Sequence, residues 1–345
     1  MRSFLVPIAV LLLAAACWWM FRGRHLQGAM LAVAALLAAV PPFQAWCTAG
    51  TGSGKGMPLI IAQMNVHEGN REHAAVVETA LGRGADVIAL QEVDERWWRA
   101  LDEGLSDRYP WSVHGFGEKN HGIALFSRLP LHEADVFPLE ELPAIRAVIG
   151  RDSLEMVVYA LHLRAPEGGA KTALRNRQWE SLAIRMLEER LPVCLVGDLN
   201  TVPWDKAFRD FRDQTGIRPG RYLLKPTWPA LGPMALIPID HLLGSNGLVI
   251  GAQETFRIPG SDHRGVLARV AAASQVPRPC ADGALRDAAP LADGSAPASG
   301  GGVQTSIAAG LQRIDPLQKF APHKPIDLGW QDDGPTGNQS PGITF

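Results

Sequence analysis

Short apolar runs that end on a polar side chain constrain this chain more than any other feature. Residues 191–196 lead into a Gly-Asp-Leu-Asn motif that carries Asp198 and Asn200, and residues 253–259 lead into a Ser-Asp-His motif. Runs of this length predict buried β-strands whose ends expose polar side chains in loops. Carboxylates beside an imidazole and a carboxamide are the groups that metal-assisted hydrolysis of a phosphate ester requires.

Further segments have the same form, an apolar strand that carries a polar residue at or near its end. They are 59–66 with Asn65, 86–93 with Glu92, 157–163 with His162 and 238–243 with Asp240. Between them, residues 71–81 and 172–190 have the apolar periodicity of helices. Strands that are apolar throughout are buried on both faces, so the pattern predicts packed sheets covered by helices.

Taken in this order, the motifs resemble the endonuclease/exonuclease/phosphatase superfamily, which has the deoxyribonuclease I-like fold, in a membrane-anchored form of bacterial type. The resemblance covers residues from about 58 to 270. It implies an α/β protein with a four-layer α/β sandwich, in which two packed mixed β-sheets are flanked by helices. It also implies a Mg²⁺ cofactor, with Mn²⁺ as a possible substitute.

The resemblance also implies a role for each polar residue. Glu92 is the principal metal ligand, Asn65 orders the metal and the substrate, and Asp262 assists the metal or the water. Among the catalytic residues implied, His162 contacts the scissile phosphate or protonates the leaving group, and Asp198 deprotonates water. Asn200 donates a hydrogen bond to a phosphoryl oxygen. His263 lies nearest the phosphate and is oriented by Asp240.

Each of these residues has a structural alternative when it is considered alone. A strand-end Asn is often a turn former, a strand-end Glu is often a surface residue, and a strand His is more often structural than catalytic. Glu92, Asp198 and Asp262 would repel one another strongly if they met, and a divalent cation would relieve that repulsion.

Two apolar runs precede this region. Residues 4–21 and 28–46 are each long enough to cross a bilayer, a basic turn at 22–25 separates them, and Pro41-Pro42 would kink or end the second. These features predict a membrane hairpin over 1–47, a Gly/Ser-rich linker over 48–57, the enzyme domain over 58–272 and a disordered tail over 273–345. The alternative for the first run is a signal peptide.

Charge bears on the substrate. Residues 57–272 contain 24 Lys and Arg against 28 Asp and Glu, so the domain lacks the basic character of proteins that hold duplex DNA tightly. The segment 206–225 is locally basic, with six Lys and Arg against two Asp, and is a candidate guide for a polyanion. A solvated helix face is its simpler interpretation.

These observations predict a membrane-tethered, Mg²⁺-dependent phosphoesterase that hydrolyses phosphodiester bonds, with nucleic acid favoured as the substrate. A phosphatase or phospholipase acting on lipid headgroups or inositol phosphates is the alternative, and a non-catalytic binding protein is a second one. The membrane is contacted through residues 4–46, and no protein partner is evident. The charge of the 22–25 turn predicts an inner or plasma membrane location with the catalytic domain on the extracytoplasmic side.

Overall fold

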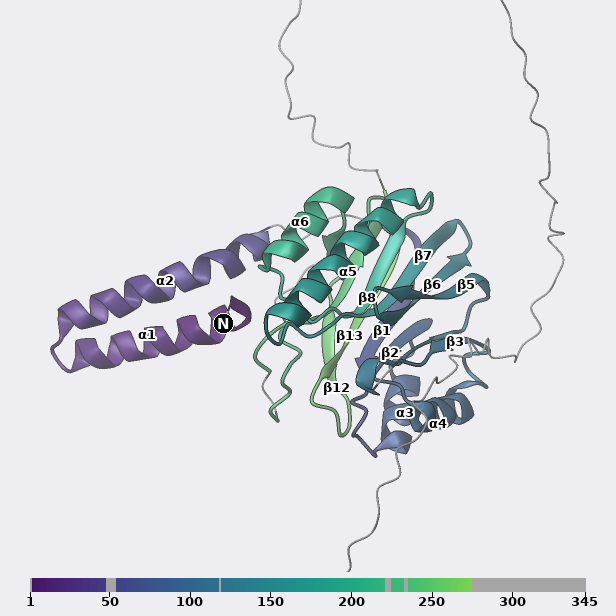
Figure 1. Ribbon diagram of the computed structural model, residues 1–345, viewed down its shortest axis with the longest axis horizontal. Coiled ribbons are helices and arrows are strands. Elements are labelled where there is room, and N and C mark those ends of the chain that lie inside the picture. Colours follow the sequence, from purple (N-terminus) through teal and green to yellow (C-terminus); the bar gives the residue numbers. More distant parts are fainter. Residues whose placement is uncertain (1, 48–53, 118, 221–224, 233–234, 275–345) are drawn as a thin grey trace, which may run out of the picture.

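The structure, a computed structural model, describes residues 2–47, 54–117, 119–220, 225–232 and 235–274 (Figure 1). Its α-helices are α1 (Leu5–Phe21), α2 (His25–Cys47), α3 (His73–Gly82), α4 (Glu95–Leu105), α5 (Gly169–Glu188) and α6 (Lys206–Thr215). Short 3₁₀ helices cover Arg2–Phe4 and Lys119–His121. The strands are β1 (Gly54–Asn65), β2 (Val87–Gln91), β3 (Trp111–Gly115), β4 (Ile123–Ser127), β5 (Leu131–Leu139), β6 (Leu142–Arg151), β7 (Leu154–His162), β8 (Val193–Asp198), β9 (Arg218–Pro219), β10 (Asp240–Gly244), β11 (Leu248–Ile250), β12 (Glu254–Arg257) and β13 (Arg264–Ala273).

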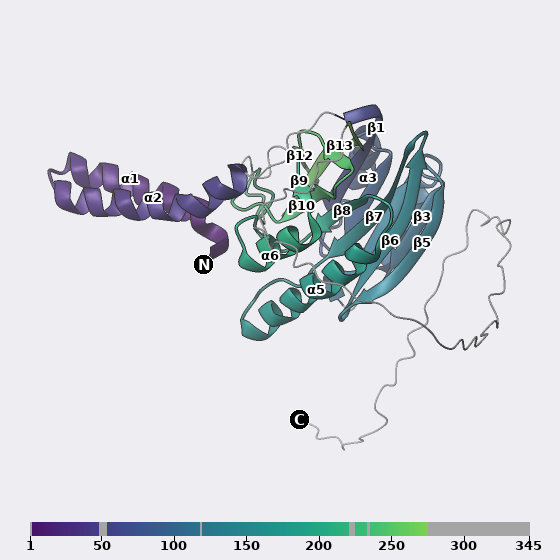
Figure 2. The same cartoon turned by 90° about the horizontal axis from the view of Figure 1, so that it is seen from above.

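The strands form two mixed sheets packed against each other. One sheet has the order β11-β13-β1-β2-β4-β3, with β12 also paired to β13, and the other has the order β5-β6-β7-β8-β10-β9. Only β1–β2 and β7–β8 are parallel among the described pairs. Helices α3 and α4 pack against the first sheet. Helices α5 and α6 pack against the second sheet, as Figure 2 shows. The predicted four-layer α/β sandwich is confirmed.

Three apolar layers explain why the sequence folds this way. The layer between the sheets consists of Val, Ile, Leu and Ala side chains such as Ile61, Val158 and Val196. In α4, Trp97, Leu101 and Leu105 repeat every four residues and bury one face against the first sheet, while Asp94 caps the helix by accepting from the Trp97 N–H at 2.8 Å. The sequence-based prediction did not include α4, although its charged face opposite these apolar residues has the pattern of an amphipathic helix.

Helices α1 and α2 pack side by side as an N-terminal pair. Gly28 permits the close contact, since a Cβ there would lie 2.5 Å from Met20 Cγ. The prediction was that Pro41 and Pro42 would kink or end this helix. Helix α2 continues through both prolines to Cys47, so they do not end it. Residues 25–45 are long and apolar enough to cross a membrane, whereas α1 is shorter, and a signal sequence or a core helix would have the same two properties.

The ends of the sandwich differ in part from the predicted domain boundaries. Residues 54–57 belong to β1, where Gly54 and Lys55 pair with Ala273 and Ala272, so these four residues are not linker. The rest of the predicted linker, 48–53, and the predicted tail beyond residue 274 lie outside the described residues.

The N-terminal pair contacts the sandwich through its first residues. Phe4 and Leu5 pack against a cluster from the loops that follow β8 and precede β10. This loop cluster consists of Val202, Trp204, Ile237 and Ile239.

Candidate active site

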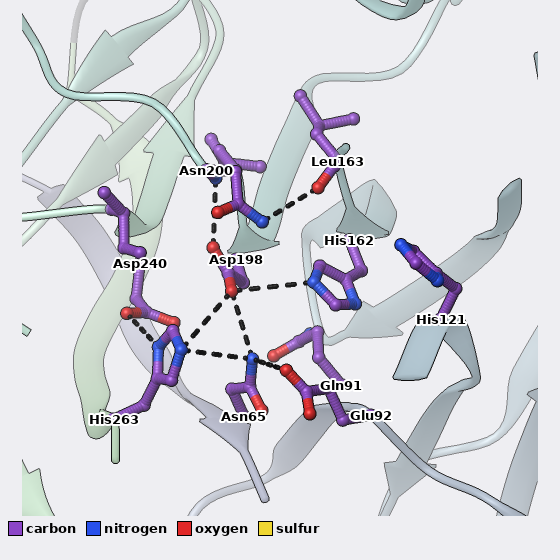
Figure 3. A network of polar contacts seen from close by, with 12 residues as sticks. Asn65, Gln91, Glu92, His121, His162, Leu163, Asp198, Asn200, Asp240 and His263 are labelled. Carbon is purple, nitrogen blue, oxygen red and sulfur yellow. Dashed lines mark hydrogen bonds and ion pairs between the residues drawn. The ribbon is translucent and has the colours of Figure 1, made fainter. Parts of the chain in front are cut away.

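The strand registers bring the predicted polar residues to one edge of both sheets. Asn65 aligns with Gln91 across the parallel pair β1–β2, which places Glu92 beside it. His162 aligns with Asp198 across β7–β8, and Asp198 also aligns with Asp240 across β8–β10. Figure 3 shows these side chains turned toward one another.

Gly197 allows the two parallel strands of the second sheet to approach. Its φ is +152°, and a Cβ there would lie only 1.9 Å from the Leu161 carbonyl oxygen, so any other residue would clash with the neighbouring backbone. The Gly of the Gly-Asp-Leu-Asn motif therefore sets the position of Asp198 relative to His162.

Asp198 lies at the centre of the site and is almost fully buried. Its Oδ2 accepts from Asn65 Nδ2 at 3.0 Å and lies 3.6 Å from His162 Nε2 and 3.7 Å from His263 Nε2 (Figure 3). Its Oδ1 accepts from the Asn200 N–H at 3.0 Å. Burial and the nearby Asp240 carboxylate raise the pKa of Asp198 to about 7.

The His263 imidazole is held between two carboxylates. Its Nδ1 lies 2.9 Å from Asp240 Oδ2, while its Nε2 faces Asp198. Burial opposes protonation, but the negative charges of Asp240 and Asp198 outweigh it and raise the pKa of His263 to about 10. The ring is therefore a cation that donates hydrogen bonds at neutral pH.

His162 has the opposite electrostatic character. Its burial, and then the neighbouring His121, lower its pKa well below the usual value, so its imidazole is neutral. The His121 ring is stacked on it at a centroid distance of 5.3 Å, and Arg164 Nη1 lies 3.1 Å from His121 Nε2. The site thus contains one charged and one neutral imidazole on opposite sides of Asp198.

The three predicted metal ligands lie on the side of the site formed by the first sheet. Glu92 has a φ of +62°; its Oε1 accepts from Asn65 Nδ2 and its Oε2 from the Glu68 N–H, both at 3.0 Å. Asp262 Oδ2 accepts from Trp228 Nε1 at 2.9 Å, whereas its Oδ1 is inaccessible to solvent and has no hydrogen-bond partner among the described residues.

The order of these motifs and their convergence match a known family. The model of the endonuclease/exonuclease/phosphatase family matches residues 62–263, which is more than half of the chain. The chain belongs to this family. It is accordingly a hydrolase of phosphoesters, and the resemblance inferred from the motifs is confirmed.

Solved structures of the endonuclease/exonuclease/phosphatase fold are similar to the chain. An endonuclease/exonuclease/phosphatase from Beutenbergia cavernae is 19% identical, with a TM-score of 0.53 over 63% of this chain and 72% of that one. Sphingomyelinase C from Streptomyces griseocarneus is 16% identical, with a TM-score of 0.50 over 62% and 99%. A mannosyl-6-phosphatase from Bacteroides thetaiotaomicron is 18% identical, with a TM-score of 0.51 over 61% and 99%.

Identities this low show the shared fold alone. No curated protein sequence matches the chain at the significance threshold applied.

The donor atoms of the site fit a divalent metal ion. Atoms of Asp198, Asp240 and His263 lie within 4.8 Å of one another, a buried cluster consistent with a metal site. In the arrangement described, His263 Nδ1 and Asp240 Oδ2 already contact each other at 2.9 Å, so these two donor atoms are engaged in a hydrogen bond. The oxygens of Glu92 and Asp262 suit a hard cation, and Asp262 Oδ1, which accepts no hydrogen bond among the described residues, is an oxygen that a cation would satisfy.

His67 is a residue of this region that the motifs did not reveal. Its Nδ1 lies 3.7 Å from Glu92 Oε2 and 3.6 Å from Asp262 Oδ1, so both carboxylates border one ring. The backbone N–H of His67 also donates to Asn65 Oδ1 at 3.0 Å, so the Asn65 side chain is held at both ends.

Two fully buried glutamines were also missed. Gln63 Nε2 donates to Asp240 Oδ1 at 2.7 Å and to Gln91 Oε1 at 2.8 Å, so Gln63 fixes the carboxylate that holds His263. The available signal was a polar residue within an otherwise apolar strand, as Gln63 is within β1.

Asn200 and His241 complete the comparison with the sequence. Asn200 has a φ of +45° and donates from Nδ2 to the Leu163 carbonyl at 2.9 Å. His241 points away from the site, with its Nε2 2.7 Å from the Thr201 carbonyl oxygen.

Proposed function

We propose that this chain is a membrane-tethered phosphodiesterase that hydrolyses the headgroup ester of a membrane lipid, with Mg²⁺ or Mn²⁺ held by Glu92, Asp262 and Asn65. The cation would neutralise charge on the phosphoryl oxygens. The oxygen-rich donor set around Glu92 supports this assignment, and so does Asp262 Oδ1, which accepts no hydrogen bond among the described residues and lies 3.6 Å from His67 Nδ1.

The roles of the catalytic residues follow from their protonation. A pKa of about 7 lets Asp198 accept a proton from water near neutral pH. The His263 cation donates to a phosphoryl oxygen, and Asp240 keeps it protonated and oriented. His162 lies across Asp198 as a neutral imidazole, which suits contact with the phosphate or the leaving group.

The packing of Phe4 and Leu5 on the loop cluster is the observation that favours a lipid substrate. Val202 lies two residues after Asn200, and Ile239 directly precedes Asp240, so the N-terminal pair is seated on the loops that bear catalytic residues. If the pair lies in a bilayer, the site opens at the bilayer surface. A lipid headgroup is the phosphodiester available there.

The basic segment 206–225, a candidate guide for a polyanion, gives weaker support to a nuclease in its folded form than its composition does. Arg212 is buried, with its guanidinium 5.8 Å from the Phe208 ring centroid, so it cannot meet a polyanion. Lys206 is paired with Asp210 at 2.5 Å. Two of the six basic residues are therefore engaged within α6 itself.

The test uses the full-length chain in vesicles with Mg²⁺. Phosphatidylcholine, sphingomyelin and phosphatidylinositol vesicles, duplex DNA and single-stranded RNA would be assayed in parallel, with Asp198→Asn as the inactive control. We expect headgroup release from at least one lipid and intact nucleic acid. Cleavage of DNA or RNA with intact lipid would instead establish the nuclease predicted from the sequence, and no hydrolysis with either Mg²⁺ or Mn²⁺ would leave the binding-protein alternative.

A further inference from the structure

A small pocket has His263 in its wall. It has a volume of about 250 Å³ and is lined by Ala230, Arg257, Ile258, Gly260, Ser261 and His263. Pockets that enclose a whole small ligand occupy roughly 300–1,000 Å³. This pocket is therefore suited to one substituent of a substrate whose phosphate is held at His263.

Arg257 gives the pocket its charge. It ends β12 and lies directly opposite Arg264 in the antiparallel register with β13, so two arginines stand on the same face of the sheet. Like charges placed directly across a strand pair destabilise a sheet. Within the described ranges, the Arg257 side chain makes no hydrogen bond or ion pair that would offset this repulsion.

The remaining lining residues leave Arg257 as the group that can meet an anion. None of them is a carboxylate, although Asp262 lies between Ser261 and His263 in the sequence, and His263 Nδ1 is already bonded to Asp240. The Ser261 hydroxyl donates to the Asn65 carbonyl at 2.7 Å and accepts from the His263 N–H at 3.0 Å, so it stabilises the wall without adding charge. The pocket thus contains one guanidinium, that of Arg257, that is available to a ligand.

We propose that this pocket binds a second oxyanion of the substrate, a phosphate or carboxylate on the headgroup, through Arg257. The planar guanidinium offers paired N–H groups that match the two oxygens of such a group. The substrate class in this inference, a lipid headgroup, rests on the proposed function. The inference predicts that the protein prefers headgroups with an added negative charge over headgroups without one.

The preference for headgroups with an added negative charge can be tested by measuring lipid hydrolysis by the full-length protein in vesicles. The substrates are phosphatidylinositol and phosphatidylinositol 4-phosphate, which differ by one phosphate. We expect the wild-type protein to have a KM lower for the phosphorylated lipid by about tenfold, equivalent to about 1.4 kcal/mol. Arg257→Gln should remove this ratio and leave the KM for phosphatidylinositol unchanged. Arg269→Gln, a change at an exposed arginine on the opposite face of β13, is the matched control and should preserve the ratio.

A binding measurement separates failure of the pocket from failure of the proposed function. The glycerophosphoinositol headgroup and its 4-phosphate would be titrated into the same proteins by calorimetry, with inorganic phosphate as a third ligand. Tighter binding of the 4-phosphate that is lost in Arg257→Gln supports the pocket even if no lipid is hydrolysed. Binding of inorganic phosphate equal to that of the 4-phosphate would identify a free-phosphate site, and an unchanged ratio in Arg257→Gln would overturn the proposal.

Discussion

At the scale of single residues, substitutions of Asp198 and His263 should lower kcat more than a substitution of Asp240. The first two face the position of the reacting groups, whereas Asp240 acts through His263. We expect Asp198→Asn and His263→Gln each to lower kcat by a factor of about a hundred or more. Asp240→Asn should lower it less. Steady-state kinetics with melting temperatures as the folding check would measure this, and an unchanged kcat in a folded Asp198→Asn protein would remove its assigned role.

Glu92 should control metal dependence. Chelation with EDTA should abolish activity, and Glu92→Gln should do nearly the same at micromolar Mg²⁺, because the variant lacks the principal anionic ligand. Glu95→Gln, three residues away in an exposed ion pair with Arg99, is the control and should behave as wild type. A Mg²⁺ titration of activity gives the comparison, and full activity of Glu92→Gln at micromolar Mg²⁺ would show that the ligand lies elsewhere.

The sequence revealed the residues that end strands but not those that support them. Asp198, Glu92 and His162 follow apolar runs, and the registers place them as the motifs implied. Gln63 and His67 were not identified as parts of the site, because their roles depend on contacts with residues distant in the chain, such as Asp240 and Asp262. The protonation state of His263 likewise could not be predicted from the sequence, because it depends on the positions of both flanking carboxylates.

At the scale of elements, helix α5 is fastened to the second sheet by a buried ion pair. Glu189, which caps α5, accepts from Arg146 Nε at 2.7 Å and from the Tyr159 hydroxyl at 2.6 Å. The hydrogen bond from Arg146, opposed by partial burial, lowers the pKa of Glu189 below its usual 4.5. Glu189 therefore adds stability above about pH 4.5, and that stability is lost as the pH falls through the folded-state pKa.

This linkage predicts the pH dependence of a Glu189→Gln variant. At pH 7 the variant should be less stable by about 1–3 kcal/mol, the usual size of a charged hydrogen bond. The difference should shrink as the pH is lowered below 4.5, because the wild-type carboxylate then becomes protonated. Thermal melts from pH 7 to pH 3 would measure it, with the exposed Glu180→Gln in the same helix as the control. A difference that grows with acidity would contradict the assignment.

Element boundaries were predicted less well where local propensity and packing disagree. Helix α2 passes through two prolines, and residues 54–57 join β1 because β13 offers a pairing edge at Ala272 and Ala273. Arg212 looked like a surface charge in the sequence but is buried in α6. For residues 54–57 the deciding neighbour, β13, is distant in the chain and absent from any local pattern.

At the scale of the whole molecule, the N-terminal pair packs against the sandwich through its first residues. Because Phe4 and Leu5 cover the loop cluster, we expect Phe4→Ala to reduce activity on vesicles by a few-fold through loosened loops near Asn200. Leu13→Ala, a change at an exposed position of α1, is the matched control. Vesicle assays at equal protein incorporation would compare them, and equal activity of the two variants would show that this packing does not influence the site.

If the N-terminal pair spans a membrane, the turn between its two helices predicts the orientation of the molecule. Arg22 and Arg24 lie there, with their guanidinium groups 5.9 and 4.8 Å from the ring centroids of Trp18 and Trp19. The positive-inside tendency places this turn in the cytoplasm and the catalytic domain on the other side, although Arg2 opposes the bias.

Alkaline phosphatase fused after Phe345 should therefore be active, since it requires an extracytoplasmic location. Replacing Arg22 and Arg24 with Gln should lower that activity, whereas Arg2→Gln should maintain or raise it, because it removes the competing charge. An inactive fusion that is produced at the same level would reverse the orientation. An N-terminal sequence that begins beyond Phe4 in the mature protein would show that the first helix is a cleaved signal, and the contact with the loop cluster would then be lost.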